Sequence, residues 1–485
     1  MLSQKFDEGS IYDMDIEELI ESLREFGEKS LHKPLLDEAL RTAEKISIAE
    51  NRTRILAEVT SNLYLSNLED LGKYVYKNMI NSADEIEKYS DKAKTFADVG
   101  KIFFDFNTVL SKELFDRSLK TADKIKDKEE RVESKIHIAK NYSDISFEDE
   151  AEMICQEIYQ DAYDLAEENN VIPLTSIAEI LAETGSVQKS IRISEKVKKF
   201  IDNISNENER CWALGKIAIV YINLKEIENA IEIAESICSE FEGNLPLGEI
   251  MISLSKEDEI GKALDLRSCI SNNELLDSIL SDIGSRLAKR GRIEEAEYVK
   301  GLIENIEEKE WVMKDIAIIK SSEGEIIKSI DIAEGLIDTD IKILTMTEIA
   351  KSLINMGKEN KLRGLVELIL ELSEDNISCS VEVNVIEVLA DMGFLDLAID
   401  RARKIEMLEE KAIALSYISA KSTGIPVLSQ DFLSTLESIK EKEIIDDKIK
   451  NDIKNIAIKL SENKNRNEIV NSIDALHDSV DRKDR

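Results

Sequence analysis

The sequence repeats a short pattern at nearly even spacing along most of its length. A small residue is followed four positions later by a second small residue, and an aliphatic residue ends the group, as in AIEIAESI at 230–237. A fixed period of 20–50 residues is typical of solenoids and related repeat arrays. From Ala230 to Leu362 the step is 33 residues four times running, and elsewhere it ranges from 33 to 40. The copies begin at Ala39, Met79, Ser118, Ala151, Ser190, Ala230, Ala263, Ala296, Ser329, Leu362, Ala398 and Phe432.

A second helical pattern precedes each copy. Before Ala230, for example, apolar or small residues recur at spacing i, i+3, i+4 and i+7, which is one face of a helix (Leu214, Ile217, Ala218 and Tyr221). A glycine often lies five residues before the small leading residue, where a chain that ends one helix needs a left-handed residue. We therefore predict a unit of helix, short turn and helix, with turn glycines at Gly185, Gly291, Gly324, Gly357 and Gly393.

Length and composition support an all-α array. The chain has 485 residues, which is more than one compact core holds, and only 18 glycines and 4 prolines. Antiparallel β proteins need more turn residues than that. We predict an α-solenoid, an α-α superhelix of about twelve antiparallel hairpins that forms a curved rod on the order of 100 Å long. It would run continuously over residues 1–461, with the best register at 130–440, and residues 462–485 would hold a break, a short capping helix and a ragged tail.

One repeat unit resembles the tetratricopeptide repeat (TPR). Leu280-x2-Ile283-Gly284-x2-Leu287, followed by Gly291 and Ala296, matches the register of the TPR pattern W-x2-L-G-x2-Y and A-x3-F. The resemblance covers roughly residues 130–440. HEAT-type repeats of about 40 residues are the alternative, because steps of 39 and 40 also occur.

Charge and motifs exclude several classes of function. A net charge of −36 disfavours nucleic acid as a partner. No apolar run approaches the length of a spanning helix and no signal peptide is evident, so we expect no membrane insertion and a cytoplasmic protein. Without a C-x-x-C pair, the five cysteines are interpreted as reduced thiols: Cys155, Cys211, Cys238, Cys269 and Cys379.

No catalytic, cofactor or metal site is predicted. The three histidines, His32, His137 and His477, fall in separate units, where an array of neighbour contacts would keep them apart. Phosphate-binding glycine loops are absent from the sequence. With 100 Asp plus Glu, any acidic pair is best explained as a solvated helix face.

The TPR resemblance implies that the first helix of each unit lines a concave, peptide-binding surface. Offsets of 18, 15, 11 and 7 residues before each leading residue share one helix face, where lysines and asparagines could hold an acidic peptide or its C-terminal carboxylate. The alternative is that lysines land there by number and that the tryptophans pack between units. The candidate groove residues are Trp212, Asn223, Lys256, Lys289, Trp311, Lys314, Lys351 and Asn355.

The sequence thus favours a protein–protein interaction scaffold that binds a protein or peptide on its concave face. A regulatory or adaptor subunit of an enzyme complex is the first alternative, and a helical-repeat enzyme with an unrecognised site is the second. The partner and the oligomeric state stay open.

Overall fold

The fold is all-helical over the part of the chain that the computed structural model describes. That part is residues 32–461 without 67, 169, 239–243, 375–376, 423–434, 437–438 and 440–446, together with positions 19, 20, 472 and 476. It holds 23 α-helices and no strand, which confirms the predicted fold class. Of the predicted repeat copies, the one that begins at Phe432 lies largely outside the described residues, as does nearly all of the predicted tail at 462–485.

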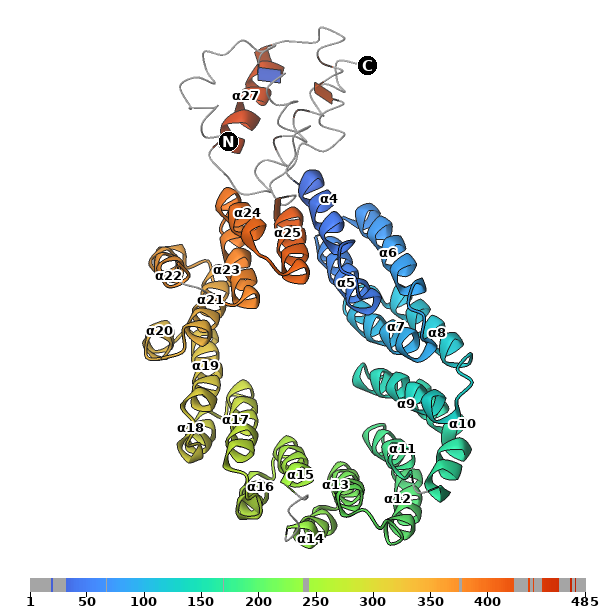
Figure 1. The fold of residues 1–485 in the computed structure, drawn as a ribbon. Helices are drawn as coiled ribbons and strands as arrows, with labels where there is room; N and C mark the ends of the chain where they lie inside the picture. Colours follow the sequence, from blue (N-terminus) through green and yellow to red (C-terminus); the bar gives the residue numbers. More distant parts are fainter. Residues whose placement is uncertain are drawn as a thin grey trace.

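The helices alternate between an inner and an outer layer (Figure 1). The inner helices are α5 (Ala49–Leu65), α7 (Tyr89–Phe104), α9 (Lys128–Asp144), α11 (Ile172–Glu183), α13 (Glu207–Asn223), α15 (Asn244–Lys256), α17 (Asn273–Lys289), α19 (Ile306–Ser322), α21 (Thr339–Asn355), α23 (Cys379–Asp391) and α25 (Leu408–Ser422). The outer helices are α4 (His32–Ala43), α6 (Glu69–Asp84), α8 (Thr108–Ala122), α10 (Glu148–Glu167), α12 (Val187–Ile201), α14 (Ile227–Ile237), α16 (Ile260–Asp265) with the 3₁₀ turn η2 (Leu266–Cys269), α18 (Ile293–Leu302), α20 (Ile326–Glu334), α22 (Glu359–Leu372) and α24 (Leu395–Lys404). A further helix, α27 (Asp447–Ser461), lies beyond α24 and α25 (Figure 1).

Eight of the ten covalent turns inside the described hairpins use a left-handed residue. All five predicted turn glycines have positive φ, between 65° and 88°. Three turns that lack glycine place Ser146, Lys225 and Asp258 in the same conformation, with φ of 61°, 63° and 66°. A residue with a side chain has a higher energy than glycine in the left-handed conformation. The geometry of the hairpin therefore imposes positive φ at these turns even where the residue does not favour it.

Small leading residues let the two helices of a hairpin approach closely, as predicted. Ala230 and Ala296 are fully buried. Two of the three serine leading residues donate a hydrogen bond to a carbonyl of the inner helix: Ser118 to Ala93 at 2.6 Å and Ser190 to Ala178 at 2.7 Å. The third, Ser329, donates to Ile326 of its own helix at 3.0 Å. A buried serine is thereby satisfied and stays as compact as alanine.

Polar side chains also fix one hairpin against the next. At three positions 33 residues apart, an inner helix accepts hydrogen bonds from backbone N–H groups just before the next inner helix. Asn244 accepts from Ser271 at 2.7 Å, and Asp277 accepts from Glu304 at 3.0 Å and from Asn305 at 2.8 Å. Glu310 accepts in the same way from Ile337 and Asp338. These bonds satisfy backbone N–H groups at or just before the N-cap of the next inner helix and so fix where that helix begins.

The array closes on itself, so the expected rod is instead a ring (Figure 1). The inner helix α25 packs against α4 and α5, the positions that an outer partner and the next inner helix take in other hairpins. α25 and α4 thus form a hairpin with no covalent turn, and the described residues make eleven hairpins in all. Eleven units close a circle when successive hairpins turn by roughly 33° on average.

Hydrogen bonds and apolar contacts hold this closure, which we call the seam. Asn51 donates to Glu409 at 2.9 Å, and Arg403 pairs with Glu38 at 2.9 Å, across more than 350 residues of sequence. Ala412 of α25 is fully buried in the same apolar cluster as residues of α4 and α5. The first and last described hairpins therefore share one core.

The interpretation of all five cysteines as reduced thiols is wrong for two of them. Cys238, at the end of α14, forms a disulfide with Cys269 in η2, with Cα atoms 4.9 Å apart. Consecutive hairpins stack side by side, which brings these neighbouring outer elements together. Cys155 and Cys211 are free and buried, and Cys379 is free and partly exposed.

Candidate functional site

Every residue of the predicted groove lies on an inner helix of the ring. The eight residues belong to α13, α15, α17, α19 and α21 (Figure 1). Several of their side chains keep a substantial exposed surface, including Trp311 at 37% and Lys289 at 64%. The inner helices are therefore accessible to solvent at these positions.

Two of the predicted residues meet in one pocket. Lys289 of α17 and Lys314 of α19 line a cavity of about 390 Å³ together with Glu348 of α21. Asp315 and three apolar side chains, Ile318, Ile319 and Leu344, complete its lining. The pocket spans three consecutive hairpins, which is what a bound extended segment would contact.

The buried carboxylate of Asp315 neutralises part of this positive charge. Its two oxygens lie 3.3 Å from the Lys289 ammonium nitrogen and 3.5 Å from that of Lys314. The Lys314 ammonium also lies 4.5 Å from the centre of the Trp311 ring, within range of a cation–π interaction. Glu348, the other carboxylate of the pocket, lies 3.0 Å from Lys351 instead. The four charged side chains of the lining sum to zero, so an anion would be attracted locally by the two lysines and not by a net charge of the pocket.

Lys351 is held more firmly than a free binding residue would be. Its ammonium contacts Glu387 at 2.9 Å, Glu348 at 3.0 Å and Asn384 at 3.3 Å. Burial alone would lower the pKa of Lys351, but the two carboxylates outweigh it and raise the pKa above its usual value. Lys351 is charged at neutral pH and already paired, so it contributes less to a groove than the sequence suggests.

The other predicted residues do not line this pocket. Trp212 is half-buried on α13, three inner helices away from Trp311 on α19. Lys256 ends α15 and Asn355 ends α21, both exposed, while Asn223 ends α13 and is half-buried. A binding strip that includes these residues stays a prediction.

Sequence reasoning missed the carboxylates that pair with inner cations around the ring. Lys216 pairs with Glu249 at 2.8 Å, and Lys140 lies 3.5 Å from Glu179, each partner on the next inner helix. The only sequence signal for such a pair is that the lysine and the glutamate lie about one repeat length apart. With 100 acidic residues in the chain, that signal does not select a partner.

A polar cluster around Asp98 was also missed. Asp98 on α7 accepts from Arg54 of α5 at 2.9 Å and lies 2.6 Å from Nε2 of His137 on α9. Asn141 donates to the same carboxylate at 3.3 Å. Burial alone would raise the pKa of Asp98, but the bonds to His137 and Arg54 outweigh it and hold the pKa below its usual range. The cluster links three inner helices and brings no nucleophile to the histidine among its members.

Metal clusters and membrane-spanning helices are absent from the part of the chain that the structure describes. No three His, Cys, Asp or Glu side chains of the described residues converge in a way that could hold a metal ion. None of the helices in the described part of the chain is long and apolar enough to cross a membrane.

Comparison with known proteins adds a likeness of fold. No protein-family model matches the chain, and no curated protein matches it either. Among solved structures, Ton1535 from Thermococcus onnurineus NA1 is similar at 15% identity over 68% of this chain and 98% of its own, with a TM-score of 0.31. A circular tandem repeat protein with novel repeat topology matches at 13% identity over 97% of this chain and 99% of its own, with a TM-score of 0.21. Both TM-scores are below 0.5, so neither likeness bears on function.

Proposed function

We propose that the ring is a protein-interaction scaffold that binds an acidic peptide segment on its inner wall, in the pocket between α17, α19 and α21. The observation that carries the proposal is the meeting of Lys289 and Lys314 at the carboxylate of Asp315, beside the partly exposed ring of Trp311. A peptide carboxylate would receive charge-assisted hydrogen bonds from the lysines. The indole offers an apolar contact for a neighbouring side chain of the peptide.

The assignment of the repeats as TPR-like is part of this proposal. It is supported by the register of inner helix, left-handed turn and small leading residue in the 33-residue units. A TPR-like hairpin presents its first helix to the concave side, which is the side where the pocket lies. The proposal needs only that orientation and does not depend on the TPR consensus residues.

Fluorescence anisotropy tests the binding directly. Two labelled decapeptides, one with an acidic C-terminal half and one with a basic one, would be titrated with the full chain. We expect the acidic peptide to bind more tightly. We expect Lys289→Glu to weaken it by roughly tenfold, because a cation becomes a repelling anion.

The matched control is Lys328→Glu on the outer helix α20, whose side chain is 65% exposed against 64% for Lys289. It makes the same change of net charge away from the pocket and should leave the affinity nearly unchanged. Asp315→Asn should strengthen binding, since it frees both lysines. Equal affinity for the two peptides, or equal effects of the two lysine variants, would refute the proposal.

A cytoplasmic location is kept as a further prediction. Reduced cysteines would have agreed with it, but Cys238 and Cys269 form a disulfide. Disulfides are rare in reducing compartments. Alkylation of the thiols in intact cells, followed by mass spectrometry of the Cys238 and Cys269 peptides, would decide between the two environments.

A further inference from the structure

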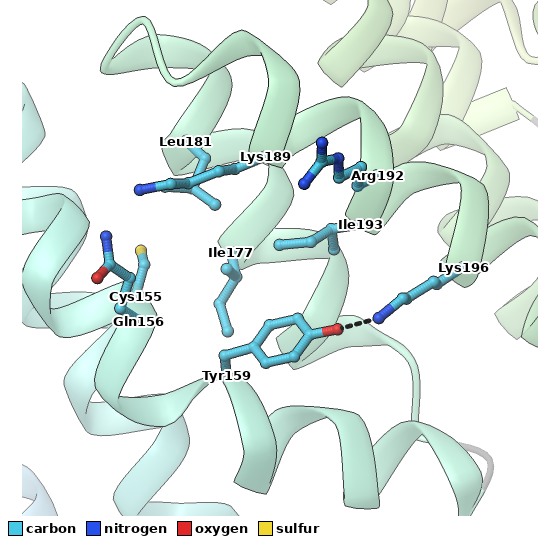
Figure 2. Close-up of a pocket in the computed structure, with 9 residues that line it drawn as sticks. All are labelled: Cys155, Gln156, Tyr159, Ile177, Leu181, Lys189, Arg192, Ile193 and Lys196. Atoms are coloured by element: carbon cyan, nitrogen blue, oxygen red, sulfur yellow. Dashed lines mark hydrogen bonds between the residues drawn. The ribbon is translucent and has the colours of Figure 1, made fainter.

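A second pocket lies between the outer helices α10 and α12, with the inner helix α11 behind it (Figure 2). In a ring the outer helices stand on a larger circle than the inner ones, so neighbouring outer helices diverge and leave a groove. This groove holds a cavity of about 260 Å³. It is separate from the inner-wall pocket and does not depend on the function proposed for that wall.

The floor of the outer pocket is apolar. Ile177 and Leu181 of α11 and Ile193 of α12 are each less than 10% exposed, and Cys155 of α10 is 1% exposed. Burial raises the pKa of the Cys155 thiol to about 12, so it is neutral and serves as a small apolar surface. An occupant would bury an apolar portion against these side chains.

The rim of the outer pocket is cationic. Lys189, Arg192 and Lys196 of α12 all line it, as Figure 2 shows. Lys189 is paired with Glu152. Lys196 instead donates to the neutral hydroxyl of Tyr159 at 2.6 Å and lies 5.3 Å from the centre of that ring.

Neither Arg192 nor Lys196 has a carboxylate within ion-pair distance in the described part of the chain, although the sequence holds 100 acidic residues against 64 basic ones. Other exposed cations there, such as Lys199 of the same helix, also lack one, but Arg192 and Lys196 differ from Lys199 in lining an apolar pocket. Two unpaired cations over an apolar floor make a site that lacks only an anion.

We propose that this pocket binds a small aliphatic carboxylate. The carboxylate would be held by the Arg192 guanidinium, which can grip both oxygens. Lys196, whose ammonium lies beside the Tyr159 hydroxyl on the other side of Ile193, would add positive charge to the rim (Figure 2). The aliphatic tail would cover Ile177, Leu181 and Ile193. The cavity is somewhat smaller than the usual range for drug-sized ligands, so a short tail suits it better than a long one.

Isothermal titration calorimetry of the full chain tests the proposal with butanoate, hexanoate and octanoate. Each added methylene that reaches the floor should improve the affinity by roughly fourfold. Octylamine, with the same tail and the opposite charge, should not bind. Arg192→Gln should weaken octanoate binding by at least about tenfold, since it removes a charged hydrogen-bond donor.

Two further variants make the outcome decisive. Lys199→Gln removes one charge from an exposed position of α12 that does not line the pocket, and should leave the affinity within about twofold. Gln156→Trp adds bulk at an exposed position of the rim and should abolish binding without touching the core. Absence of octanoate binding at millimolar concentration, equal binding of octylamine, or equal effects of Arg192→Gln and Lys199→Gln would overturn the proposal.

Discussion

The seam is the joint of the ring most sensitive to a buried charge, and Ala412→Glu tests this. Ala412 lies on α25, is fully buried, and packs in the cluster that includes residues of α4 and α5. A glutamate there has no cationic partner in that apolar cluster. It can regain water only if α25 separates from α4 and α5, and no covalent turn joins α25 to either helix.

The magnitude follows from the cost of an unpaired buried charge, which is about 3–5 kcal/mol. Because each 1.4 kcal/mol is a factor of ten, the closed ring should lose roughly two to four powers of ten relative to the open form. Burial raises the pKa of a carboxyl, so protonation would relieve the cost at low pH. The closed form of the variant should therefore be favoured as the pH falls and lost as it rises, and pH 8 is the condition to use.

Small-angle X-ray scattering at pH 8 measures the opening, since an open arc has a larger radius of gyration than a closed ring. The matched control is Ala317→Glu, at a fully buried alanine of the inner helix α19. Short covalent connections join α19 to the helices on both sides. The Ala317→Glu variant should therefore be less stable than the parent protein while its ring stays closed. If Ala412→Glu leaves the scattering unchanged, or if both variants open alike, the seam is not the weak joint.

Three further predictions concern single contacts. Reduction of Cys238–Cys269, or Cys238→Ala, should lower the stability of the adjoining hairpins by about 3–4 kcal/mol, as expected for a separation of 31 residues, and calorimetry with and without reductant measures it. Gly291→Ala should cost roughly 1–2 kcal/mol because φ is +76° there, whereas Gly364→Ala, in an exposed turn of α22 with open space around it, should be neutral or stabilising in a thermal melt. Because the folded protein lowers the pKa of Asp98, its carboxylate should stabilise the fold fully above the ordinary pKa of 3.8 and lose this effect as the pH falls through the lower folded value. Asp98→Asn should therefore make the free energy of unfolding less dependent on pH in the acid range, as measured by denaturant unfolding at a series of pH values.

The hairpins could be predicted from the sequence because their signals are local. A glycine such as Gly291 and a small residue such as Ala296 stand five positions apart, and both are needed to turn the chain and pack the two helices. The turn at Lys225 was not predicted as left-handed, because lysine gives no sign of positive φ and only the geometry of the hairpin imposes it.

The closure, the disulfide and the partners of the groove lysines depend on contacts that local sequence does not encode. The sequence of α4 has the pattern of any other outer helix. None of its residues indicates that its partner inner helix is α25, at residues 408–422. Cys238 and Cys269 meet because outer helices stack, and Asp315 is one of 100 acidic residues that could have faced Lys289. The candidate pocket was therefore foreseen in its cations and not in its carboxylate.

The seam can close only late in synthesis of the chain on the ribosome. The hairpin that closes the ring is built from the first outer helix and from an inner helix that ends at Ser422. Roughly 380 residues must be added between the end of α4 at Ala43 and the end of α25 at Ser422, and a ribosome that adds about 5–20 residues per second needs some 20–80 seconds to make that length. For this interval Leu36 and Leu40, buried in the finished ring, have no α25 to cover them. On a polysome, where neighbouring chains are crowded, α4 of one chain can meet α25 of another, and an exchange of these helices would link two rings through the same contacts that close one.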